Sequence, residues 1–181
     1  MELKEEMVSQ QTVYEGIIVN VRRDKARLVE GRIANREVVE HPGGVAVFAM
    51  DGQGRVALVR QFRYPLGEVT LELPAGKLER GEEPFAAMRR EQKEETGTFS
   101  DHYVSLGVVY PTPAYDTEKI YLWAGRVSGW GEQKLDDGEL LEVVRVPLDE
   151  AERRVLNNEF PDAKTQIGIL KAAALVRAGQ L

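Results

Sequence analysis

The sequence predicts an α/β protein with one main domain, and two observations indicate this. Apolar residues make up 43% of the 181 residues, which suffices for one hydrophobic core and fits the usual size of a single domain. Short β-rich runs bounded by glycine recur along most of the chain, while residues 84–95 and 163–181 carry helical patterns. A small β sub-domain is expected to precede the main domain.

Composition excludes several classes of protein. The chain has no cysteine, so disulfide frameworks and cysteine-bound zinc are ruled out. The longest apolar run, about residues 45–50, falls far short of the ~20 residues that cross a bilayer. The first six residues are mostly charged, unlike a secretory signal. We therefore expect a soluble, cytoplasmic protein without a membrane partner.

The charge balance limits the ligands. The formal net charge is −6 and the sequence pI is about 5.2, which argues against binding to the phosphate backbone of nucleic acids. If the ligand is nevertheless a phosphate compound, a metal cation must mediate its binding.

The amino-terminal part predicts a small antiparallel β sub-domain. Gly16 and the pair at 30–31 separate β-rich runs at residues 12–14, 17–21 and 26–29. The sequence His-Pro-Gly-Gly at 41–44 punctuates the chain. We place the boundary there, with a sub-domain at 1–42 and the main domain at 43–181.

The main domain begins with two apolar runs, 45–50 and 55–62, around an Asp-Gly turn, which predicts a hairpin. A helix follows over 84–95, with Pro84 at its first position and Gly97 just after its end. The remaining elements are strands at 103–110, 120–126 and 140–146 and a closing helix at 163–181. The apolar faces of the two helices are predicted to consist of Phe85, Ala86 and Met88 and of Ile167, Leu170, Ala174 and Leu175.

Three carboxylates share one face of the first helix. Glu91 and Glu95 lie about 40° apart around the helix axis, and Glu94 lies about 60° to the other side. Like charges at this spacing destabilise an isolated helix by roughly 0.2–0.5 kcal/mol per pair, which favours a functional reason for the cluster. The alternative is a solvated acidic face relieved by Arg90 and Lys93.

The residues around these carboxylates follow the pattern G-x5-E-x7-R-E-U-x-E-E-x-G-U, where U is apolar. The matching positions are Gly76, Glu82, Arg90, Glu91, Glu94, Glu95 and Gly97. The sequence therefore resembles the Nudix hydrolase family. Gln92 and Thr98 depart from the pattern because they occupy U positions. A poorly satisfied Gln92 amide at the edge of the core is expected, which predicts that Gln92→Leu raises stability.

Further segments resemble one branch of that family. Residues 36–43, 60–63 and 71–76 are similar to the ADP-ribose pyrophosphatases and related nucleoside diphosphate sugar hydrolases, and residues 112–118 resemble a loop of that branch. Ala114 and Tyr115 stand where that loop has glycine and phenylalanine. The resemblance implies an α/β/α sandwich with a mixed sheet.

The resemblance also implies an activity, which is metal-dependent hydrolysis of ADP-ribose to AMP and ribose 5-phosphate. Hydrolysis of GDP-mannose or another nucleotide sugar is an alternative, and a non-catalytic nucleotide-sugar-binding regulatory module is a third possibility. Two to three Mg²⁺ or Mn²⁺ ions per site are implied, and hard oxygen ligands suit them. A homodimer that exchanges residues 1–42 is also implied.

Each role in the site is implied position by position. The implied metal ligands are the carbonyl of Ala75 and the carboxylates of Glu91, Glu95 and Glu94. The implied general base is Glu118, with Glu94 as the alternative. Arg63 is expected to bind phosphate, and Arg36 and Glu37 are expected to hold the nucleobase. An arginine suits phosphate because its planar guanidinium matches oxyanions. Cross-strand surface pairing is the alternative reading of the three substrate-binding residues.

Overall fold

The computed structural model describes residues 3–181, which form two compact units. The N-terminal unit runs up to Gly43 and includes Tyr110–Lys119, and the core unit consists of Gly44–Val109 and Ile120–Leu181. The predicted domain boundary after residue 42 stays a prediction. Within residues 3–181, no helix has the length and apolarity needed to cross a membrane.

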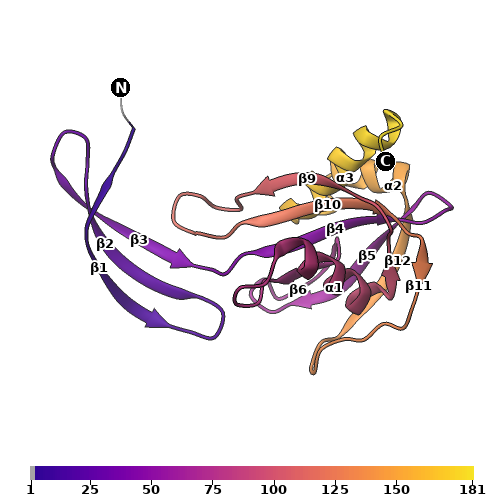
Figure 1. Cartoon of the computed structure of the whole chain (residues 1–181), viewed down its shortest axis with the longest axis horizontal. Helices are drawn as coiled ribbons and strands as arrows, with labels where there is room; N and C mark the ends of the chain where they lie inside the picture. Colours follow the sequence, from indigo (N-terminus) through magenta and orange to yellow (C-terminus); the bar gives the residue numbers. More distant parts are fainter. Residues whose placement is uncertain (1–2) are drawn as a thin grey trace. The chain divides into compact units, whose positions relative to one another are not determined.

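The N-terminal unit is a three-stranded antiparallel sheet, drawn in indigo and violet in Figure 1. Its strands, in spatial order, are β1 (Glu6–Glu15), β2 (Asn20–Arg27) and β3 (Ile33–Glu40). The predicted strand residues 17–19 and 28–29 are turns instead, and the sequence analysis did not foresee β3. Polar residues fill much of β1, so periodicity did not show its true length.

Residues 110–119 attach to β3 by backbone hydrogen bonds. The N–H of Val39 donates to the carbonyl of Tyr115 at 2.7 Å, and the N–H of Thr117 donates to the carbonyl of Val39 at 3.0 Å. The N–H of His41 donates to the Thr117 hydroxyl at 3.0 Å. The segment that carries Glu118 is therefore anchored within the N-terminal unit.

The core unit is built on a seven-stranded mixed sheet (Figure 1). Its main order is β12-β5-β4-β10-β9, with β6 paired to β5 and β7 paired to β4. The pair β4–β10 is parallel and the other pairs are antiparallel. The strands are β4 (Gly44–Met50), β5 (Arg55–Arg63), β6 (Glu68–Glu72), β7 (Ala75–Lys77), β9 (Tyr103–Val109), β10 (Ile120–Arg126) and β12 (Leu141–Pro147), and the small pair is β8 (Thr98–Phe99) and β11 (Gly129–Trp130).

Helices cover both faces of this sheet. All seven residues of β4 are buried, which is expected for a central strand covered on both sides. Val47 packs in one cluster with Met88 of α1 (Pro84–Thr96), and Phe48 packs in the other with Ile169 of α3 (Ala163–Arg177). A third helix, α2 (Leu148–Leu156), contributes to the second cluster. The predicted α/β/α sandwich is thus confirmed.

The hairpin prediction is only partly right. β4 and β5 flank the predicted turn but pair with each other only at Met50 and Val56. Beyond that point β4 pairs with β10 and β7, and β5 pairs with β12 and β6. The short strands β6 and β7 and the helix α2 were not predicted.

Helix α1 has the predicted ends. Pro84 lies in the first turn, and Gly97 ends the helix with a left-handed φ of 63°, which glycine adopts without strain. The predicted inward face is wrong in part, because Phe85 is 37% exposed and Ala86 is also exposed. Met88 is buried as predicted, and the buried face consists of Ala87, Met88, Gln92, Glu95 and Thr96.

Helix α3 also forms, but it ends at Arg177, and its predicted inward face is only partly right: Ile167 and Leu175 are partly buried and pack against the core. Leu170 and Ala174 are exposed, whereas Thr165, Gly168, Ile169, Ala172 and Ala173 are buried. A β-carbon on Gly168 would lie 2.4 Å from Leu73 Cδ1, so the helix approaches residue 73 closely. Small residues on this face permit that approach, and their weak apolar signal hid the face from the periodicity.

Gln92 is fully buried and has partners for its amide, contrary to the expected core-edge position. Its Nε2 donates to the Thr98 hydroxyl at 3.1 Å and to the Ser100 hydroxyl at 3.4 Å, and its Oε1 accepts from the Tyr103 hydroxyl at 2.7 Å. Gln92 and Thr98, the two residues that depart from the Nudix pattern, are therefore hydrogen-bonded to each other. Buried polar groups with partners do not carry the cost of unpaired ones.

The expected effect of Gln92→Leu is therefore reversed. Removing the amide takes a partner from the buried Thr98 hydroxyl and from the partly buried Tyr103 hydroxyl, and we expect a loss of about 1–3 kcal/mol in the free energy of unfolding. Urea unfolding measures this. The double variant Gln92→Leu/Thr98→Val should lose less than the sum of the single variants, because it removes both partners. An unchanged or higher midpoint for Gln92→Leu would contradict the network.

Candidate metal and active site

The backbone of β7 lies directly against two glutamates of α1. Glu95 is 5% exposed, and its Oε2 accepts a hydrogen bond from the Ala75 N–H at 2.8 Å. A β-carbon on Gly76 would lie 1.9 Å from Glu91 Cδ, so only glycine leaves room for that carboxylate. The motif therefore places Ala75, Glu91 and Glu95 together, and their roles as metal ligands stay a prediction.

Arg90 holds three of the motif glutamates. Its Nε and Nη2 each donate to the Glu82 carboxylate at 3.0 Å, and its Nη1 donates to Glu91 at 2.8 Å and to Glu94 at 2.9 Å. Glu82 also accepts the N–H of Glu79 at 3.0 Å. Glu82 and Arg90 thus tie the loop before α1 to the helix and gather the carboxylates by charge.

The two glutamates beside β7 are hard to ionise. Burial raises the pKa of Glu95 to about 8, with a further upward contribution from Glu91, although the Ala75 N–H opposes it. Burial also raises the pKa of Glu91 to about 6, against the lowering effect of Arg90. These carboxylates lack enough positive charge around them, which a bound cation would supply.

The donor set fits a hard divalent cation. Carboxylate oxygens with a nearby backbone carbonyl suit Mg²⁺ or Mn²⁺, whereas zinc usually takes histidine or cysteine. In residues 3–181, no three histidine or acidic side chains already converge on one point as a cation cluster. The motif carboxylates do not converge because each has its own partner: Arg90 binds Glu91 and Glu94, and the Ala75 N–H binds Glu95.

Comparison with known proteins gives the family. Residues 40–167 match the NUDIX domain. The chain belongs to the Nudix family. The predicted family and enzyme class, a Nudix pyrophosphohydrolase, are confirmed.

Two curated relatives and one solved structure are similar to this Nudix protein. It is 35% identical to an ADP-ribose pyrophosphatase of Bacillus subtilis (strain 168), over 92% of this chain and 91% of the relative. It is 33% identical to a GDP-mannose pyrophosphatase of Yersinia pestis (strain Pestoides F), over 72% of this chain and 70% of the relative. A crystal structure described as an ADP compounds hydrolase matches with a TM-score of 0.83 and 20% identity over 100% of both chains, which shows the fold.

Glu139 is a further carboxylate whose charge acts on Glu91 and Glu95, and the sequence analysis did not name it. Its segment lies along the end of α1, where the Lys134 N–H donates to the Glu94 carbonyl at 2.9 Å and the Gln133 amide donates to the Glu95 carbonyl at 2.6 Å. The exposed Glu139 carboxylate adds to the raised pKa values of both Glu91 and Glu95, after the larger effect of burial. The acidic run at 136–139 was the available signal.

Arg63, predicted to bind phosphate, lies in the core unit at the end of β5. Its Nε and Nη2 each donate to the Glu72 carboxylate at 2.8 Å. These hydrogen bonds raise the pKa of Arg63, and the charges of Asp162 and Glu95 contribute in the same direction. The Glu95 carboxylate therefore contributes to the raised pKa of Arg63.

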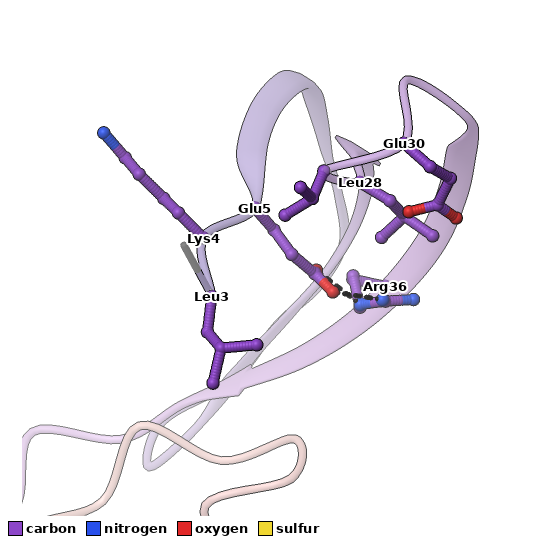
Figure 2. Close-up of a pocket in the computed structure, with 7 residues that line it drawn as sticks. Leu3, Lys4, Glu5, Leu28, Glu30 and Arg36 are labelled. Carbon is purple, nitrogen blue, oxygen red and sulfur yellow. Dashed lines mark hydrogen bonds and ion pairs between the residues drawn. The ribbon is translucent and has the colours of Figure 1, made fainter. Parts of the chain in front are cut away.

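The predicted nucleobase residues, Arg36 and Glu37, belong to the N-terminal unit. Arg36 donates two hydrogen bonds to Glu5, at 2.8 and 2.5 Å, within a pocket that Leu3 and Leu28 also line (Figure 2). Glu37 is exposed and lies opposite Arg23 on β2. An acidic side chain of the same unit therefore engages Arg36.

Glu118, the predicted general base, also belongs to the N-terminal unit. Its N–H donates to Asp116 Oδ1 at 2.8 Å, and its Oε1 lies 3.5 Å from His41 Nδ1. The same ring nitrogen accepts the N–H of Gly43 at 3.1 Å. The structure thus places the predicted residues in two sets, with Arg36, Glu37 and Glu118 in one unit and the motif residues and Arg63 in the other.

Proposed function

We propose that this Nudix protein hydrolyses the pyrophosphate bond of ADP-ribose, giving AMP and ribose 5-phosphate. The observation that carries the proposal is the pair formed by the buried Glu95 and the partly buried Glu91, held against the backbone of Ala75 and Gly76. The ADP-ribose pyrophosphatase that resembles this chain over nearly its whole length supports the substrate. GDP-mannose is the second candidate substrate, and the GDP-mannose pyrophosphatase relative supports it.

A divalent cation is part of the proposal. The carbonyl of Ala75 and the carboxylates of Glu91, Glu95 and Glu94 would hold two to three Mg²⁺ or Mn²⁺ ions. Such ions, when bound, lower the pKa of water and neutralise charge on phosphate oxygens. Arg63 would bind a phosphate, and Arg36 and Glu37 would bind the base.

The general base in this proposal is a carboxylate other than Glu91 and Glu95. The resemblance assigns Glu118, with Glu94 as the alternative. Glu139 is a third candidate, which we favour because it lies in the same unit as Glu91 and Glu95 and its charge acts on both. A base accepts the proton of the attacking water, which requires an accessible carboxylate of this kind.

The first test is a substrate panel with Mg²⁺. We expect ADP-ribose to give AMP and ribose 5-phosphate faster than GDP-mannose or UDP-glucose, as measured by chromatography of the products. Glu91→Gln and Glu95→Gln should each lower kcat by orders of magnitude, because each removes a charge from the proposed cation site. Unchanged turnover in both variants at saturating Mg²⁺ would refute the assignment.

A stability measurement separates this loss of activity from misfolding. Since burial raises the folded-state pKa of Glu95 from 4.5 to about 8, ionisation of this group costs stability as pH rises through that interval. Without divalent cation, Glu95→Gln should therefore unfold at a higher midpoint than the unmodified protein at pH 8. At pH 4.5 the difference should be small. A lower midpoint at pH 8 would contradict the burial of an unpaired carboxylate.

Three variants identify the general base. We expect Glu139→Gln to lower kcat roughly 10²–10⁴-fold, the usual contribution of a general base, with little change in unfolding midpoint. Glu118→Gln and Glu94→Gln are its matched controls, measured over pH 6–9. Assignment to Glu139 fails if its variant keeps a near-normal kcat while one of the other two loses it.

We also propose that the protein is a homodimer formed through the N-terminal unit. All ten residues of β1 are exposed, including Val8 and Tyr14, and a sheet without a covering layer rarely stands alone. Light scattering after size exclusion should give twice the chain mass of 20.3 kDa, about 41 kDa. Val8→Glu/Tyr14→Glu should shift the mass towards 20.3 kDa, whereas Gln10→Glu on the same strand should not. A wild-type monomer would refute the proposal.

A further inference from the structure

Glu72 is a buried carboxylate at the end of β6, with a side chain 3% exposed. It accepts two hydrogen bonds from Arg63 at 2.8 Å each, one from the Thr70 hydroxyl at 2.6 Å and one from Lys164 of α3. Burial would raise the pKa of Glu72, but Arg63, Lys164 and Thr70 together lower it to about 2. The carboxylate is therefore ionised at every working pH and its oxygens are occupied.

The stretch of chain after Glu72 connects this cluster to the buried Glu95 of α1. The Leu73 N–H donates to the Thr165 hydroxyl at 2.8 Å, and Thr165 is fully buried in the first turn of α3. Two residues later, the Ala75 N–H donates to Glu95 of α1. Residues 72–75 are thus fixed to α3 at one end and to α1 at the other.

The contact with Glu72 determines how Arg63 presents its charge. Nε and Nη2 form a two-point contact with one carboxylate, which fixes the plane of the guanidinium. Within residues 3–181, Arg63 Nη1 donates no hydrogen bond, so the edge of the guanidinium that carries Nη1 is available to a ligand. A cavity of about 460 Å³ is lined by Arg63, Thr70, Glu72 and Lys164, among others, so solvent reaches this cluster.

We propose that Glu72 is a positioning residue, which orients Arg63 so that its available edge binds a phosphate of the nucleoside diphosphate substrate. The inference rests on the proposed function, in which Arg63 binds phosphate. Arginine has many rotamers, and fixing them before the substrate arrives removes an entropic cost from binding. Lys164 and Thr70 hold Glu72 in turn.

A double-mutant cycle on KM for ADP-ribose tests this role. Glu72→Gln keeps the shape but removes the charge that fixes Arg63, and we expect KM to rise about tenfold with a smaller change in kcat. Arg63→Gln should raise KM at least as much. The double variant should resemble Arg63→Gln alone, because a positioning residue has no effect once the group it positions is gone.

Two further variants separate positioning from general stability. Asp51→Asn is the matched control, because Asp51 is also buried and also bonds an arginine, Arg55, but in the turn between β4 and β5. It should lower the unfolding midpoint and leave KM unchanged. Thr70→Val is a milder change that removes one hydrogen bond to Glu72, and it should raise KM by about two- to fivefold even if Glu72→Gln fails to fold.

The outcomes distinguish this inference from the proposed function. A wild-type protein that hydrolyses no nucleoside diphosphate sugar would overturn the proposed function itself. If the wild type is active, an unchanged KM in both Glu72→Gln and Thr70→Val overturns only the positioning role. Fully multiplicative effects of Glu72→Gln and Arg63→Gln on KM would also overturn it, because they would show independent contributions.

Discussion

The hydrogen bond from the Ala75 N–H to the buried Glu95 carboxylate is the interaction on which the rest of the site depends. It joins β7 to α1 at the point where the helix brings its charges inward. Gly76 then leaves space for Glu91, and Arg90 holds both Glu94 and Glu82, the latter from the loop before the helix. Burying these carboxylates costs stability, as the raised pKa values of Glu91 and Glu95 indicate. The fold accepts this cost at the one place where a cation would offset it.

The sequence predicted most of what local patterns control. The ends of α1 follow from Pro84 and Gly97, and the shared face of Glu91 and Glu95 follows from helix geometry. The helix faces were less predictable, because Ala87 in α1 and Gly168 in α3 are buried by close approach rather than by strong hydrophobicity. The true length of β1 was missed for a related reason, since a strand with no buried residue shows no apolar alternation, and only its residues 12–14 were predicted.

Long-range polar partners lay beyond the reach of sequence reasoning. Gln92 looked poorly satisfied because its partner Tyr103 is eleven residues away, on β9. Lys164 meets Glu72 across 92 positions in the chain, and no periodicity connects them. Glu139 was not named because its effect on Glu91 and Glu95 depends on the tertiary contacts that hold residues 131–134 against the end of α1. In each case the tertiary fold, and not the residue type, decides whether a polar side chain is paired.

The attachment of residues 110–119 to β3 has a consequence for dissecting the protein. The chain enters the N-terminal unit twice, once at its beginning and again between β9 and β10. A truncated protein that starts at Gly44 would keep the 110–119 excursion but lose the strand that accepts and donates its backbone hydrogen bonds at Val39. The two units are therefore not separable by a single cut. A clean excision would also have to replace the excursion with a short turn from Val109 to Ile120.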